Sequence, residues 1–147
     1  MRQKPKLTNL QQGILTERIV ESKFIERSFN TLLPRSPGGT VDLLVEKDNK
    51  FIRLQIKSSH YSKDTDTYRS TLLKSGHKKY DFKELDYFAV YNYEYDALYI
   101  VPVDFIGEKT NLTLYPHRDK GVSKYASRGK DYNLNDYLNN FDLKSSI

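Results

Sequence analysis

The chain of 147 residues contains no cysteine, which excludes disulfides and thiolate metal sites. No apolar run is long enough to span a bilayer, and the opening MRQKPKLTNLQQG lacks the apolar segment of a secretory signal. The histidines at positions 60, 77 and 117 lack zinc-ligand spacing, and SPGG at residues 36–39 is a turn rather than a phosphate-binding loop. From these absences we expect a cytoplasmic protein without membrane contact, a zinc centre or P-loop chemistry.

Positive charge is in excess, with 24 Lys and Arg against 19 Asp and Glu and a net charge of +5. Many globular proteins share such a value, so the distribution says more about a polyanionic partner. Residues 57–83 and 117–130 are predominantly basic and have the composition of loops, whereas residues 131–147 are acidic and rich in Asn. The twelve tyrosines suit strands and interfaces better than phosphate contacts.

The order of predicted elements indicates one domain over residues 1–147 with an α/β or α+β core. We expect residues 1–7 to form a basic arm and residues 58–76 a polar loop with at most one short element. The predicted helices and strands are a helix from Thr8 or Asn9 to about Asn30, strands at 40–46 and 51–57, a short helix in 78–86, strands at 87–93 and 97–105, and a C-terminal helix in 133–143.

The stretch VDLLVEKDNKFIRLQIKSS, residues 41–59, reads as a β-hairpin that turns at Asp48 and Asn49. A symmetric turn there matches apolar faces, which supports this register. The pairs it predicts are Val45 with Ile52, Leu43 with Leu54, and Val41 with Ile56.

Three polar side chains interrupt these strands. Because strand side chains alternate between faces, the register places Asp42 opposite Gln55, with Lys57 one diagonal step away. The hairpin therefore predicts a polar group on one face of an otherwise apolar pair of strands.

The first helix adds a carboxylate. Its expected apolar stripe contains Leu10, Ile14, Val20, Phe24 and Ile25. Glu17 lies in line with Leu10 and Phe24, where burial of a charge is costly without a partner. Glu21, near the same stripe, is the competing candidate.

A less specific interpretation is that Asp42 and Lys57 form a salt bridge, that Glu17 is solvated, and that Gln55 is an ordinary edge residue. We favour a functional site because four polar groups converge on one buried position.

The pattern Asp42, twelve residues, Gln55, one residue, Lys57, on a hairpin behind a helix with Glu17, resembles the PD-(D/E)XK nuclease superfamily. The resemblance is greatest to the homing endonucleases encoded in bacterial group I introns of transfer-RNA genes, which also have Gln at the second acidic position. It covers the first helix, the hairpin and the later strands, and implies a restriction-endonuclease-like core with a central mixed β-sheet flanked by helices. Val41 and Gln55 depart from the proline and the acid of the superfamily's name.

The resemblance implies metal-dependent hydrolysis of DNA phosphodiester bonds, with Mg²⁺ or Mn²⁺ as cofactor. Asp42 would bind the metal, Gln55 would complete the shell, and the backbone carbonyl of Ile56 would contribute. Lys57 would hold the nucleophilic water or offset charge at the phosphate, and Glu17 would act through the metal or its water. The number of metal ions stays open, because an amide contributes no charge.

Basic clusters in residues 58–80 and 117–147 would bind double-stranded DNA. Their members are Lys63, Arg69, Lys74, His77, Lys78, Lys79, Arg118, Lys120, Lys124, Arg128 and Lys130. A long target site requires more than one copy of so small a domain, and the resemblance implies a homotetramer built as a dimer of dimers. Aromatic residues in 91–99 and the C-terminal segment are candidate contacts between copies.

Three alternatives remain at this point. A Holliday-junction resolvase or a restriction endonuclease would share the same core and site. A DNA-binding module without catalysis is the third, because Gln55 replaces an acidic ligand.

Overall fold

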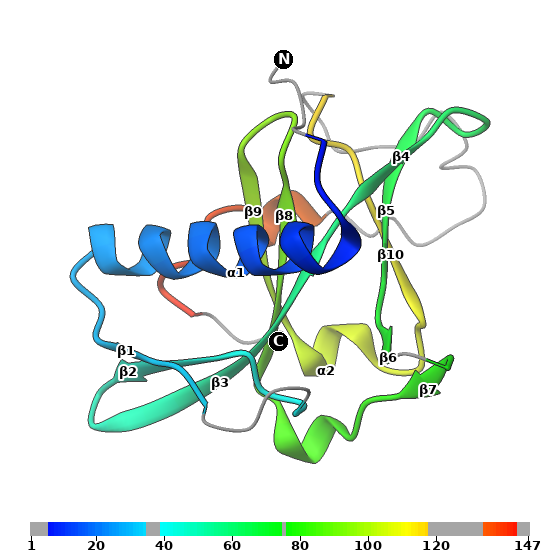
Figure 1. Ribbon diagram of the computed structural model, residues 1–147. Coiled ribbons are helices and arrows are strands. Elements are labelled where there is room, and N and C mark those ends of the chain that lie inside the picture. Colours follow the sequence, from blue (N-terminus) through cyan, green and yellow to red (C-terminus); the bar gives the residue numbers. More distant parts are fainter. Residues whose placement is uncertain (1–5, 35–38, 75, 118–133, 144–147) are drawn as a thin grey trace.

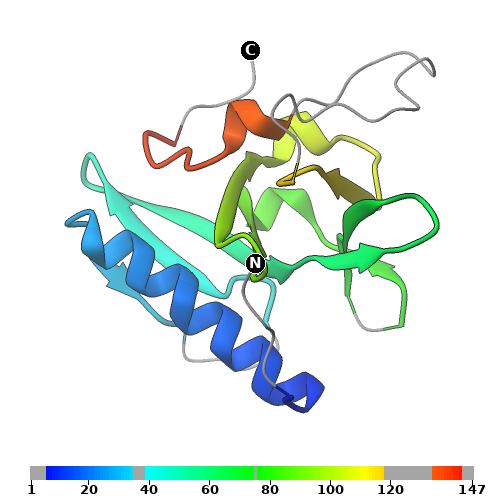
Figure 2. The same ribbon diagram turned by 90° about the horizontal axis from the view of Figure 1, so that it is seen from above.

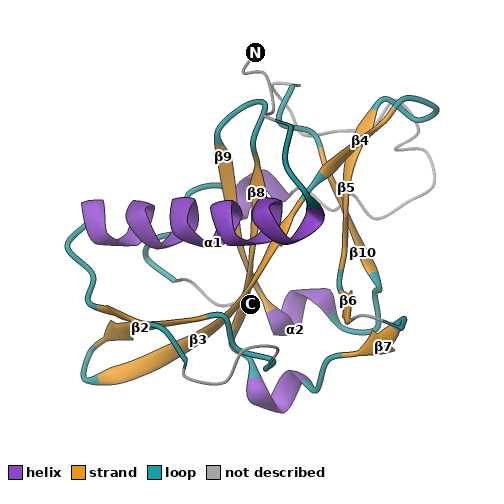
Figure 3. Cartoon of the chain, viewed as in Figure 1, coloured by secondary structure: helices purple, strands orange, loops and turns teal. Residues whose placement is uncertain are grey.

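The computed structural model describes residues 6–34, 39–74, 76–117 and 134–143 (Figure 1). Within these ranges no helix has the length and apolar character needed to cross a membrane. The α-helices are α1 (Asn9–Glu26) and α2 (Val103–Ile106), and the 3-10 helices are η1 (Phe82–Glu84) and η3 (Leu134–Tyr137). The strands are β1 (Thr31–Leu32), β2 (Leu43–Lys47), β3 (Lys50–Ser58), β4 (His60–Ser62), β5 (Thr67–Thr71), β6 (Leu73–Lys74), β7 (Lys78–Lys79), β8 (Tyr87–Asn92), β9 (Ala97–Pro102) and β10 (Asn111–Leu114) (Figure 3).

A five-stranded sheet in the order β1-β2-β3-β8-β9 forms the centre. The β3–β8 pair is parallel and the other pairs are antiparallel, so the sheet is mixed, as predicted. Helix α1 packs on one face, and the smaller β10-β5-β4 sheet, α2 and η3 supply the core on the other face (Figures 1 and 2). Strands β8 and β9 are buried along their whole length, which confirms that both apolar runs form strands. The predicted second strand, 97–105, is too long, because Pro102 is the N-cap of α2 and residues from Val103 are helical.

Helix α1 begins where the sequence predicts and ends earlier than expected. Thr8 forms a capping box with Gln11. At the other end Ser28 has φ 66°, and the Phe29 and Ser28 amides donate to the Phe24 and Ile25 carbonyls. This is a Schellman motif, sealed by contact between the rings of Phe24 and Phe29 at 5.5 Å. The helix therefore stops at Glu26, not near Asn30.

The predicted apolar stripe of α1 is wrong over its first turns. The buried residues are Thr16, Val20 and Phe24, whereas Leu10 is 75% exposed and Ile14 47% exposed. Ile25 is exposed as well. The physical reason is that the buried line of α1 follows Thr16, Val20 and Phe24 at four-residue spacing, and the predicted apolar residues Leu10, Ile14 and Ile25 lie off this line.

The β2–β3 hairpin has the predicted register, with Val45 opposite Ile52 and Leu43 opposite Leu54. Asp48 and Asn49 have φ of 52° and 64°, the left-handed pair that a type I′ turn needs. The predicted placement of Val41 is wrong, because it packs in the core on the face opposite α1. Strand β2 begins only at Leu43, so the alternation does not extend back to Val41.

The predicted loop at 58–76 is instead two hairpins. Strand β3 continues past Ser59 into β4, which pairs with β5, and β6 pairs with β7. Strand β5 buries Thr67, Tyr68 and Ser70. Two of these three side chains are small and polar, which gave the segment the composition of a loop.

Two predicted helices are single 3-10 turns. Residues 78–86 contain only η1, and the described part of 133–143 contains η3 followed by turns. Leu138 forms a bridge with Tyr99, and Asn139 has φ 53°, so the chain leaves helical geometry there.

Of the ten tyrosines in the described residues, seven are buried in the core or pack against it, as the composition suggested. Tyr91 and Tyr99 are fully buried, while Tyr95 is 41% exposed. The aromatic stretch 91–99 therefore offers less surface for contacts between copies than the sequence suggested.

Candidate active site

Asp42 immediately precedes β2 and meets the polar residues of β3. Its Oδ2 accepts a hydrogen bond from Gln55 Nε2 at 2.6 Å and another from the Ile56 backbone amide at 3.0 Å. The Asp42 amide donates to the Leu54 carbonyl at 2.8 Å, which holds the residue against β3. The structure thus brings Asp42 and Gln55 together, as the hairpin register predicts.

Gln55 is buried, with 6% of its surface exposed, and its Oε1 has no hydrogen-bond partner in the described part of the chain. Within the same ranges, no hydrogen bond reaches Oδ1 of Asp42. A buried carbonyl oxygen without a partner loses the full free energy of its hydration, so its presence requires an explanation. A cation would supply the missing partner.

Lys57 lies on the same face of β3 as Gln55, two residues further on. Its Nζ donates to the Leu73 carbonyl at 3.1 Å. Burial lowers the pKa of Lys57, and the Asp42 carboxylate opposes this shift. The ammonium is thus held within electrostatic reach of Asp42, although no direct ion pair joins the two among the described residues.

The electrostatics tie Glu17 to the same group. Burial raises the pKa of Asp42 to about 6, the Ile56 hydrogen bond lowers it, Glu17 raises it and Lys57 lowers it. Burial also raises the pKa of Glu17 itself, against the charge of Arg18. The other three predicted groups therefore all interact with Asp42, Glu17 and Lys57 through their charges and Gln55 through its hydrogen bond.

Glu21, the competing carboxylate, has a different role. Its Oε2 accepts a hydrogen bond from Thr31 Oγ1 at 3.3 Å, which links α1 to β1. Glu17, not Glu21, contributes to the potential at Asp42.

The donor set fits a hard divalent cation. It comprises the Asp42 carboxylate, Gln55 Oε1, the Ile56 carbonyl and, further out, Glu17, all of them oxygen donors as Mg²⁺ and Mn²⁺ prefer. No three His, Cys, Asp or Glu residues gather anywhere in the described ranges, so a site with several acidic or imidazole ligands is absent there.

The predicted DNA-binding residues divide into three groups. Lys63, Arg69, His77, Lys78 and Lys79 are exposed, and Lys79 pairs with Glu108 at 3.4 Å. Lys74 is partly buried beside the Tyr80 ring. The remaining candidates, Arg118, Lys120, Lys124, Arg128 and Lys130, lie outside the described residues.

Sequence reasoning missed Tyr80. Its ring centroid lies 4.9 Å from Lys57 Nζ and 5.3 Å from Lys74 Nζ. Burial, together with the Asp42 charge, raises the pKa of Tyr80 to about 12. Nothing in the sequence distinguished this tyrosine from the other eleven.

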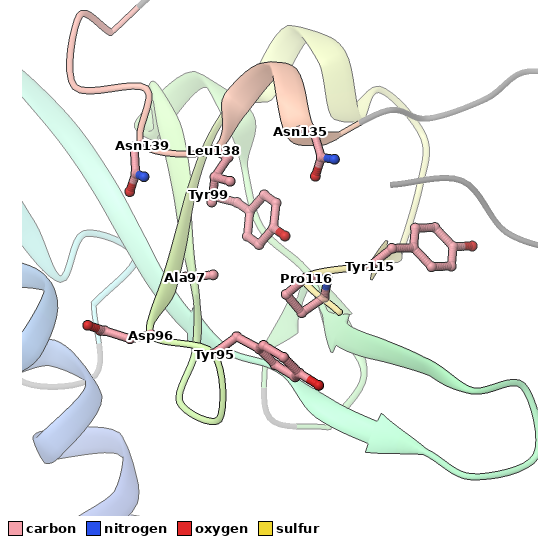
Figure 4. Close-up of a pocket in the computed structure, with 9 residues that line it drawn as sticks. All are labelled: Tyr95, Asp96, Ala97, Tyr99, Tyr115, Pro116, Asn135, Leu138 and Asn139. Atoms are coloured by element: carbon pink, nitrogen blue, oxygen red, sulfur yellow. The ribbon is translucent and has the colours of Figure 1, made fainter. Parts of the chain in front are cut away.

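A separate pocket of about 370 Å³ lies along β9 and shares no residue with the Asp42 group (Figure 4). Its lining comprises Tyr95, Asp96, Ala97, Tyr99, Tyr115, Pro116, Asn135, Leu138 and Asn139. The candidate active site is thus not this hollow but the polar group at the start of β2.

A mixed sheet flanked by a helix, with Asp42 beside Gln55 and Lys57 of β3, is the arrangement that the sequence pattern predicted for a nuclease. The family model of the PD-(D/E)XK endonuclease matches residues 8–134, and the chain belongs to this family. The protein is therefore a DNA endonuclease, in a family that generally uses divalent metal ions.

Among solved structures, the chain is similar to a bacterial homing endonuclease, I-Ssp6803I, with a TM-score of 0.70 and 20% sequence identity. The match covers 92% of this chain and 91% of that one. At this identity the likeness establishes the fold. No curated protein sequence matches the chain.

Proposed function

We propose that this chain is a homing-type endonuclease that cuts both strands of DNA at a long target site, with Mg²⁺ as its cofactor. The observation that carries the proposal is the hydrogen-bonded Asp42–Gln55 pair. Within the described part of the chain it leaves the buried Gln55 Oε1 without a partner, and no hydrogen bond reaches Asp42 Oδ1. The similarity in fold to a bacterial homing endonuclease supports the choice within the family.

Asp42, Gln55 Oε1 and the Ile56 carbonyl would hold the metal, with Glu17 at its outer side. When bound, Mg²⁺ supplies Lewis-acid stabilisation of the charge that develops at the phosphate and lowers the pKa of a coordinated water. The Gln55 amide hydrogen bond fixes the orientation of the Asp42 carboxylate, so that one oxygen stays oriented away from the backbone.

Lys57 would place a positive charge beside the scissile phosphate or orient the attacking water. Its Nζ uses one N–H for the Leu73 carbonyl, which leaves others for the substrate. Glu17 would accept a proton or orient water, and its raised pKa, caused by burial, brings it closer to neutral pH than an exposed carboxylate.

We assign residues 1–147 to a single nuclease domain, with residues 1–7 as a basic arm. The segment 58–80 would face DNA, and exposed Lys63, Arg69 and Lys78 support this assignment. Residues 117–147 would add DNA contacts and contacts between copies.

Two copies are needed to cut both strands with one active site each, and we propose a dimer of dimers as the working assembly. A tetramer also extends the length of DNA that so small a domain contacts. A group I intron as the source of the coding sequence belongs to the same proposal.

Digestion of a randomised duplex library with Mg²⁺, followed by sequencing of the cut ends, tests this function. We expect double-strand cuts at one long sequence and none without metal. Asp42→Asn should abolish cutting and retain DNA binding in a gel-shift assay, because loss of a negative charge near phosphate does not oppose binding. Frequent cutting at a short sequence, or cutting by Asp42→Asn at the parent rate, contradicts the proposal.

A further inference from the structure

Tyr80 follows β7 and lies against the strands that carry the candidate site. Its ring contacts Phe88 edge-on, with centroids 5.7 Å apart and an interplanar angle of 75°. Phe88 is fully buried and is the partner of Gln55 in the parallel β3–β8 ladder. The ring is therefore fixed to the same pair of strands that presents Gln55.

The Lys57 ammonium has two contacts that hold it in place. Its Nζ donates to the Leu73 carbonyl at 3.1 Å and lies 4.9 Å from the Tyr80 ring centroid, within the range of a cation–π interaction. Leu73 opens β6 and Tyr80 follows β7, so the β6–β7 hairpin contacts the ammonium from both of its ends.

A lysine side chain has four rotatable bonds and loses considerable entropy when it is held in one arrangement. A hydrogen bond to one carbonyl leaves the ammonium free to swing about that bond. The Tyr80 ring restricts this motion on one side of the ammonium, which stays within electrostatic reach of Asp42.

We infer that Tyr80 is a positioning residue for DNA hydrolysis, whose ring, with the Leu73 carbonyl, holds the Lys57 ammonium beside Asp42. The inference rests on the proposed function, which gives Lys57 its role at the phosphate. The ring does this through its π face, so Phe should replace Tyr80, and an aliphatic side chain should not.

The chain provides a matched control for a purely structural role. Phe82 also contacts Phe88 edge-on, at 5.8 Å and 71°, but among the described residues no lysine or arginine lies over its ring. Loss of the Phe82 ring removes a comparable packing contact and leaves Lys57 unaltered.

The experiment compares Tyr80→Phe, Tyr80→Leu, Phe82→Leu and Lys57→Ala in single-turnover cleavage of a duplex recovered from the library. We expect Tyr80→Leu to slow cleavage by about tenfold, a factor between those for an exposed and a fully desolvated cation–π contact. Its DNA dissociation constant should stay near that of the parent. Tyr80→Phe and Phe82→Leu should cut at close to the parent rate.

A second readout does not depend on metal or DNA. In the metal-free protein, the ε-methylene protons of Lys57, assigned with Lys57→Arg, should show an upfield ring-current shift in lysine-labelled NMR spectra. Tyr80→Leu should abolish this shift, while Tyr80→Phe and Phe82→Leu should keep it.

The outcomes separate the two proposals. If Lys57→Ala cuts as fast as the parent, the proposed role of Lys57 fails. If Lys57→Ala is inactive while Tyr80→Leu cuts at the parent rate, the positioning role of Tyr80 fails and the proposed function stands. If Tyr80→Leu and Phe82→Leu lowered the cleavage rate equally, Tyr80 would contribute only a packing contact, and the inference would be wrong.

Discussion

At the scale of single residues, the ionised carboxylate of Asp42 lowers the stability of the folded chain. Burial raises the pKa of Asp42 from 3.8 to about 6, and Glu17 adds to the shift. A raised pKa means that the folded chain disfavours the ionised carboxylate. At a pH between 3.8 and about 6, the unfolded chain therefore binds fewer protons than the folded chain. Folding stability should therefore fall as pH rises from about 4 through about 6.

Asp42→Asn tests this sign. We compare the free energy of unfolding of the metal-free variant with that of the metal-free parent. The difference in favour of the variant should be about 1–2 kcal/mol larger at pH 8 than at pH 4, after allowance for solvent screening. Urea unfolding at the two pH values measures the difference.

Asp86→Asn is the control of opposite sign. Although burial raises it, the pKa of Asp86 is lowered overall by hydrogen bonds from Arg53, so its contribution to stability is present above its ordinary pKa and lost as pH falls. Asp86→Asn should therefore lower the free energy of unfolding more at pH 8 than at low pH. Equal pH dependence in both variants would contradict the assignment of Asp42 as a disfavoured charge.

Much of the site could be predicted because the turn fixes the register. Asp48 and Asn49 select a two-residue turn, and the apolar pairs then place Asp42 opposite Gln55. Tyr80 could not be predicted, because its approach to Lys57 depends on how the β6–β7 hairpin folds over β3.

At the scale of elements, local signals and long-range pairing account for what the sequence did and did not predict. The cap at Thr8, the turn at residues 48–49 and the apolar runs of β8 and β9 are local, and the sequence located them. Strand β5 pairs with β10, about forty residues further along the chain, and this pairing has no local signature. The exposure of Leu10 and Ile14 in α1 could not be foreseen either, because they lie off its buried line, which includes the polar Thr16.

The end of α1 offers a test of element geometry. Ser28 has φ 66°, which is unfavourable for a residue with a Cβ, so Ser28→Gly should stabilise the protein by about 0.5–1 kcal/mol. Ser22→Gly, the same substitution at an exposed helical position, should destabilise by about 0.5 kcal/mol. Thermal unfolding of the two variants measures both, and a shared sign would contradict the Schellman assignment.

At the scale of the whole molecule, the basic surface and the polar group should act on the same DNA. Exposed Lys78 lies on the β6–β7 hairpin, and Leu73 of this hairpin and Tyr80 directly after it both contact the Lys57 ammonium. A hairpin that contacts phosphate would thereby bring the backbone of DNA close to Asp42. The location of the positive charge, and not its net value, links binding to cleavage.

Salt dependence checks this arrangement. Lys78→Gln should weaken binding of the target duplex and reduce the slope of log affinity against log salt by about 0.9, the value for one phosphate contact. Lys50→Gln, at the exposed β2–β3 turn, removes the same charge and should leave the slope unchanged. Equal changes in the two variants would indicate a general effect of net charge.

The central claim is that Asp42 and Gln55 hold a divalent ion, and Mn²⁺-induced line broadening in NMR spectra of glutamine- and isoleucine-labelled protein measures it most directly. We predict that Mn²⁺ broadens the side-chain amide signals of Gln55 and the backbone amide of Ile56 first, that the signals of exposed Gln11 persist, and that Asp42→Asn removes the effect. Broadening that is centred elsewhere, or that survives in Asp42→Asn, would contradict the account.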